Sequence, residues 1–174
     1  MGALKYPQLT LGILAIFFYV GAEVTVGSFM TGFVGLPEIK GIPPAAATIY
    51  VALYWGSIMI GRFSGAVTVF ELKPLLKKIL IAVMPVLTFF FILLIFKMKS
   101  GDGFSIGDMM IYLPFIAISI IAFFVGQEKA ARTLLLFSII CIVLLIISLI
   151  TTGDIAMWSV ISLGLYNSIM WPSI

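Results

Sequence analysis

Long apolar stretches follow one another along this sequence, and they restrict its fold more than any other feature. Six can be delimited, at about 9–30, 45–70, 79–96, 109–125, 133–151 and 155–174. A helix needs about 20 apolar residues to cross a bilayer, and it satisfies its own backbone hydrogen bonds there. The sequence therefore predicts an all-α, polytopic membrane protein of about six transmembrane helices. We expect one membrane domain, 1–174, and no soluble domain.

The residue types present exclude several kinds of chemistry. The chain is 63% hydrophobic and 10% charged, has no His, and has one Cys, Cys141, within an apolar stretch. A soluble domain is about a quarter charged. Without His, neither the usual zinc sites nor Ser-His-Asp triads can be built. We expect no catalytic residue, no metal, no cofactor and no enzymatic activity.

The basic residues predict the orientation of the chain in the membrane, because loops rich in Lys and Arg stay cytoplasmic. An N-terminus inside the cell leaves only Lys40, Lys97 and Lys99 outside. The other seven are then cytoplasmic: Lys5, Arg62, Lys73, Lys77, Lys78, Lys129 and Arg132. The net charge of +3 thus reflects the orientation of the chain in the membrane. The expected partner is the lipid bilayer. We expect no nucleic-acid binding.

Glu23 is the acid inside the first apolar stretch. A charged side chain at that depth costs about 2.5 to 3.5 kcal/mol, so it faces a partner or a cavity. Tyr19 and Gly27 lie four residues before and after it, on the same helix face. The carboxyl is then either a ligand-binding or proton-linked group, or a protonated acid that holds two helices together.

A polar stripe occupies one face of the second stretch. Its members recur at helical spacing: Tyr50, Tyr54, Ser57, Gly61 and Ser64. The stripe either offers aromatic rings and hydroxyls to a sugar-like ligand, or combines interfacial aromatic residues with helix packing. Gly61 and Gly65 form a GxxxG pattern, which is typical of close helix contact. Arg62 is expected near the cytoplasmic end, where it reaches the headgroups or pairs with a nearby acid or helix C-terminus.

Polar side chains return in the last stretch. Asn167 and Trp171 are four residues apart, so one face carries an amide and an indole that could hold a hydroxylated ligand. The alternative is an amide that bonds a neighbouring helix. Pro172 would bend the helix and free a carbonyl group.

Three short stretches together resemble a known family. They are FFYVGAE at 17–23, GRFSG at 61–65 and NSIMWPSI at 167–174. In this order they resemble the C-terminal half of sugar-proton symporters of the major facilitator superfamily, in the branch of L-fucose permease and the bacterial glucose/galactose transporters. The resemblance implies that four of the stretches correspond to helices seven to ten of a twelve-helix carrier.

The same resemblance implies a function and a site. The family imports a hexose of the glucose, galactose or fucose class together with protons, by alternating access in the bacterial inner membrane. The expected substrate-binding residues are Glu23, Tyr19, Tyr54, Asn167 and Trp171, and the expected structural or gating residues are Gly61, Arg62, Gly65 and Pro172.

The chain departs from the family pattern in two ways. Two additional apolar stretches, within 109–151, form an inserted hairpin, and the N-terminal half of the transporter is missing, so the chain resembles a fragment. The alternative is a complete six-span structural or interaction subunit of a membrane complex, without transport of its own. In that case Glu23 only joins two helices.

Overall fold

The secondary structure is entirely helical in the part of the chain that the computed structural model describes, residues 5–100, 106–126 and 129–168. In chain order the helices are α1 (Pro7–Gly35), α2 (Pro44–Val69), α3 (Pro74–Ser100), α4 (Ile106–Met110), α5 (Leu113–Gly126), α6 (Ala130–Ile150) and α7 (Gly153–Ser168). Helices α1, α2, α3 and α6 are long and apolar enough to cross a membrane, and α5 is a shorter apolar helix. The prediction of an all-α polytopic membrane protein is confirmed.

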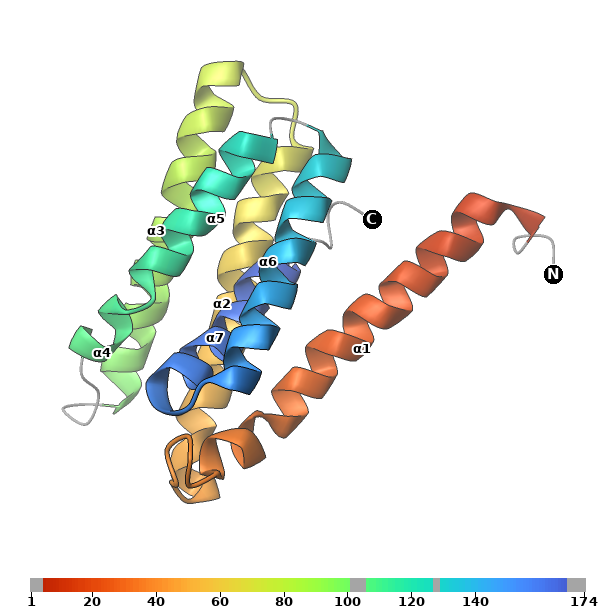
Figure 1. Ribbon diagram of the computed structural model, residues 1–174. Helices are drawn as coiled ribbons and strands as arrows, with labels where there is room; N and C mark the ends of the chain where they lie inside the picture. The colour runs from red at the N-terminus through yellow and green to blue at the C-terminus, as the bar shows by residue number, and fades with distance from the viewer. Residues whose placement is uncertain (1–4, 101–105, 127–128, 169–174) are drawn as a thin grey trace.

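Successive long helices run in alternating directions (Figure 1). The connection between α1 and α2 and the turn between α6 and α7 lie at one end of the bundle, and the connection between α2 and α3 lies at the other. Proline begins α1, α2 and α3, at Pro7, Pro44 and Pro74. This residue suits the first turn of a helix because the N–H that it lacks would have no partner there.

Two boundaries differ from the sequence-based expectation. Helix α3 continues to Ser100, beyond the predicted end at residue 96, because Lys and Met are good helix formers. The predicted span 109–125 is interrupted, with α4 ending at Met110 and α5 beginning at Leu113. Pro114 explains the break, since proline has no N–H to donate and its ring clashes with the carbonyl group four residues earlier, here that of Met110.

Helix α2 lies at the centre of the packing. It packs most extensively against α7, and also against α3 and α1, while α6 packs against α7. A Cβ atom at Gly164 of α7 would lie only 2.8 Å from the carbonyl oxygen of Tyr54, so the missing side chain lets the two helices approach closely. This contact holds α7 beside the helix that carries Tyr54 and Arg62.

The predicted hairpin segment 109–151 takes part in the core. Tyr112, Phe123 and Phe137 are all buried, and Phe137 packs against Tyr166 of α7 with ring centroids 5.8 Å apart. The Tyr166 hydroxyl donates to the carbonyl oxygen of Phe115 in α5 at 2.7 Å. These contacts bind the segment to α7. Its status as an insertion relative to the family stays a prediction.

Two polar contacts join the connections at one end of the bundle. Lys40, after α1, pairs with Asp154 of α7 at 2.5 Å. The backbone N–H of Gly153 donates to the carbonyl oxygen of Glu38 at 2.8 Å. Lys40, Glu38 and Asp154 therefore share one side of the bundle.

Helix α1 leans away from the other helices toward its N-terminal end (Figure 1). Its buried residues form one stripe, Tyr19, Glu23, Gly27, Met30 and Val34. Its other faces expose large apolar side chains, such as Phe17 at 68% and Phe29 at 71%. An apolar exposed surface of this kind suits lipid, and the buried stripe brings Glu23 to α2.

Candidate functional site

Glu23 lies on the face of α1 that packs against the bundle, and 5% of the residue is exposed. Tyr19 and Gly27 lie on the same face, as their spacing predicted. Gly27 makes room for α2, because a Cβ atom there would lie 3.0 Å from the ring of Trp55. The close approach places the Glu23 carboxyl group at the interface between α1 and α2.

Both oxygens of the Glu23 carboxyl group are bonded to other side chains. The Tyr19 hydroxyl donates to Oε2, and Nη2 of Arg62 donates to Oε1 at 2.7 Å. The Glu23 side chain is 6% exposed and the Arg62 side chain 50%, so the pair reaches from the interface to the surface of the bundle. The Arg62 guanidinium and the Tyr19 hydroxyl thus hold the carboxyl group from two sides.

Tyr54 approaches the same turn of α1 from α2. Its hydroxyl donates to the backbone carbonyl oxygen of Glu23 at 3.0 Å, and the side chain is 1% exposed. We call Tyr19, Glu23, Tyr54 and Arg62 the Glu23 cluster. It combines a carboxylate, a guanidinium group and two phenols at one helix interface.

The sequence predicted Arg62 near the cytoplasmic end of its helix and left its partner open. Of the alternatives left open by the sequence, the structure shows pairing with an acid. A signal for this pair was present, because Glu23 and Arg62 are the charged residues within the first two apolar stretches. Charges inside a membrane tend to pair with one another.

The polar stripe of α2 does not form one ligand-facing surface. Tyr54 bonds α1, whereas Ser57 and Ser64 donate to carbonyl groups of their own helix, those of Leu53 and Ile60. Tyr50 packs, partly buried, against the hydrophobic core. The contacts of these side chains therefore agree with the packing interpretation for most of the stripe.

Gly61 and Gly65 are both buried on α2. A methyl group at Gly61 would overlap the carbonyl oxygen of Leu165 and the hydroxyl group of Ser168 on α7. Asn167 is half-buried near the end of α7. Trp171 and Pro172 lie outside the described residues. The structure thus brings together Tyr19, Glu23, Tyr54 and Arg62, with Gly61 at the neighbouring interface.

Apolar helices arranged as a bundle, with an ion pair between two of them, define the class of protein: a polytopic membrane protein with paired charges inside its membrane domain. Among the described residues, no group of three His, Cys, Asp or Glu side chains is placed to hold a metal ion. The Glu23 cluster, with its buried acid and its ion pair between two helices, is the candidate site.

Relatives with known names make the class more specific. The chain is 33% identical, over 99% of its length, to the protein named Glucose/galactose transporter of Brucella abortus biovar 1 (strain 9-941). It is 26% identical, over 98% of its length, to the Putative glucose/galactose transporter of Helicobacter pylori (strain ATCC 700392 / 26695). The chain spans 28% of the length of each relative. No family model matches, and no solved structure matches.

The chain is therefore a homologue of part of a sugar transporter, and its resemblance to the glucose/galactose transporters is confirmed. The relatives are named as transporters rather than as enzymes. Their names agree with the prediction that the chain is not an enzyme.

Proposed function

We propose that this chain is part of a major facilitator transporter that imports a hexose with protons by alternating access in the bacterial inner membrane. The observation that carries the proposal is the Glu23–Arg62 ion pair at the interface of α1 and α2. Intramembrane charges are costly and mark substrate or ion pathways. Relatives named for glucose and galactose transport support a hexose of the glucose, galactose or fucose class.

The chemistry of the Glu23 cluster suits a sugar. The carboxylate accepts hydrogen bonds from sugar hydroxyls, the Arg62 guanidinium donates to them, and the phenols of Tyr19 and Tyr54 do both. We propose that Tyr19, Glu23 and Tyr54 face the sugar path, together with Asn167 and Trp171 from the last span. Each oxygen of the carboxyl group already accepts one bond from a protein partner in this arrangement, so sugar hydroxyls would add to these bonds or replace them.

Arg62, Gly61, Gly65 and Pro172 are proposed as structural or gating residues. An ion pair between two helices resists their separation, and the Arg62 end of the pair is half-exposed. Replacing the Arg62 bond to Glu23 by a bond to sugar would release α1 from α2 during the transition. Gly61 supports α2 on its other side through the close contact with α7.

We propose that proton binding takes place in a part of the transporter outside this chain. Because the chain spans 28% of the length of its relatives, we propose that it works with an N-terminal half. The carboxylates that bind protons in the family would lie in that half. The alternative, a structural subunit, predicts no transport at all.

Uptake by the complete transporter tests this proposal. Proteoliposomes containing it would be given radiolabelled glucose, galactose or fucose, with and without an inward proton gradient. The proposal predicts saturable uptake of at least one hexose, accelerated by the gradient. Intact protein that transports none of them would contradict the proposal and favour the structural subunit.

A further inference from the structure

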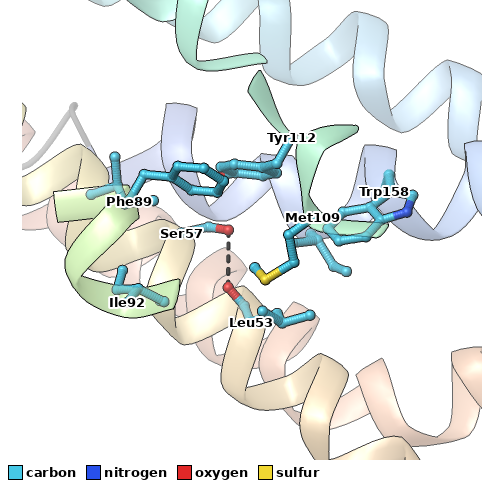
Figure 2. A pocket seen from close by; sticks show the side chains of 10 residues that line it. Leu53, Ser57, Phe89, Ile92, Met109, Tyr112 and Trp158 are labelled. Atoms are coloured by element: carbon cyan, nitrogen blue, oxygen red, sulfur yellow. Dashed lines mark hydrogen bonds between the residues drawn. The ribbon is translucent and has the colours of Figure 1, made fainter. Parts of the chain in front are cut away.

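A small pocket lies in the core between α2, α3, α7 and the break that separates α4 from α5. Its volume is about 10 Å³, and the side chains around it are buried. Figure 2 shows the side chains that line this pocket, and no residue of the Glu23 cluster is among them. The residues that matter for the following argument are Leu53, Ser57, Phe89, Tyr112 and Trp158.

The Tyr112 hydroxyl is the unusual group in this pocket. The residue is 2% exposed, and its hydroxyl makes no hydrogen bond of ordinary geometry with the residues that the structure describes, although the Ser57 hydroxyl lies near it. The Tyr112 ring stacks on Phe89 with centroids 5.9 Å apart and packs against Trp158 at 6.2 Å. Because the ring is held by both neighbours, its hydroxyl cannot turn away to find a partner elsewhere.

An acceptor for a bridging molecule lies on α2. The Ser57 hydroxyl lines the same pocket and donates its proton to the carbonyl oxygen of Leu53 at 3.0 Å (Figure 2). The Ser57 oxygen therefore keeps lone pairs for another donor. The Leu53 carbonyl oxygen has none to spare, because within α2 it also accepts the backbone N–H four residues later.

We propose that this pocket binds one water molecule, which accepts the proton of the Tyr112 hydroxyl and donates to the Ser57 oxygen on α2. A cavity must offer about 10 to 15 Å³ to the centre of a water molecule, together with two to four polar partners. The pocket volume of about 10 Å³ meets this requirement for one water. Tyr112 and Ser57 supply the two partners.

Such a water would join the start of α5 to α2. Tyr112 lies in the break between α4 and α5, directly before α5 begins at Leu113, where the regular helical hydrogen bonds stop. Ser57 is three residues from Tyr54, which bonds the backbone of Glu23. The water thus supports α2, the helix that carries Tyr54 and Arg62, whether or not the protein transports sugar.

Thermal unfolding of the complete protein in detergent tests the water site through Tyr112→Phe, which removes only the hydroxyl group. If water is bound, the substitution deprives it of a partner, and the unfolding midpoint falls by about 2 °C or more. If the pocket is dry, the substitution removes an unpaired buried hydroxyl, and the midpoint stays or rises. The second result would overturn the proposal. Tyr6→Phe, at a residue that is 66% exposed, is the matched control and should leave the midpoint unchanged.

A high-resolution density map of the same protein supplies the second measurement. A peak within hydrogen-bond distance of both the Tyr112 hydroxyl and the Ser57 hydroxyl supports the bound water. An empty pocket, or a direct bond from Tyr112 to Ser57, contradicts it.

Discussion

Arg62 of α2 donates a hydrogen bond to Glu23 of α1, with Nη2 2.7 Å from Oε1, although 39 positions separate the two residues in the chain. The bond joins a nearly buried carboxylate to a half-exposed guanidinium group. Tyr19 and Tyr54 add bonds to the side chain and backbone of the same glutamate. Glu23 is therefore bonded to α2 through both its side chain and its backbone.

We expect Glu23→Gln to reduce hexose uptake by the complete transporter about 10- to 100-fold. An amide keeps the size of the side chain but loses its charge, and a hydrogen bond to a charged group is worth about 1.5 to 3 kcal/mol. Uptake of radiolabelled sugar, normalised to the amount of protein in the membrane, is the measurement. Glu38→Gln is the matched control, since Glu38 is exposed in the connection after α1. Wild-type uptake by the Glu23 variant would refute the assignment of Glu23 to the sugar path.

Glu23→Gln and Arg62→Gln should each lower stability by about 1 to 3 kcal/mol, because each leaves the opposite charge without its partner. The double variant leaves neither charge unpaired. Residues in direct contact are not additive, so its loss should be smaller than the sum of the single losses. Unfolding in detergent for all four proteins measures this coupling. Strictly additive losses would show that the pair contributes no interaction of its own.

Gly61→Ala should lower stability by about 1 to 3 kcal/mol, the usual cost of overpacking. The added methyl group would overlap the Leu165 carbonyl oxygen on α7, and backbone atoms cannot move aside as a side chain can. Gly12→Ala is the control, because nothing lies within 4 Å of a Cβ atom at that position of α1. Equal stability of the two variants would mean that α2 and α7 are less closely packed than described here.

The proposed orientation predicts which positions a membrane-impermeant thiol reagent reaches in intact cells. Single cysteines would be introduced into a Cys141→Ala background. Lys40→Cys should react, since its connection faces outward, whereas Lys78→Cys should react only after the cells are opened. Lys40 follows α1 and Lys78 lies near the start of α3, and the connection after α1 and the start of α3 lie at opposite ends of the bundle (Figure 1). The reverse pattern would show that the chain has the opposite orientation in the membrane.

Much of the fold followed from local patterns. Hydrophobic stretches located the long helices, and the i, i+4 spacing placed Tyr19 and Glu23 on one buried face of α1. The break after Met110 was missed although Pro114 signals it, because a continuous apolar composition masked the backbone effect of the proline. The spacing of the polar stripe correctly predicted a helix for α2. Spacing alone could not predict which neighbouring group each side chain contacts.

By itself, the sequence determined the helices, their apolar surfaces and the presence of one acid and one arginine in the first two membrane stretches. These properties depend on contacts within a single helix or on transfer of a side chain from water to lipid, so they can be read locally. Only the tertiary structure decided that Arg62 bonds Glu23, that Tyr54 supports the Glu23 backbone, and that Tyr112 faces a pocket beside Ser57. These pairings depend on the rotation and separation of packed helices, which are set by the shapes of many side chains together.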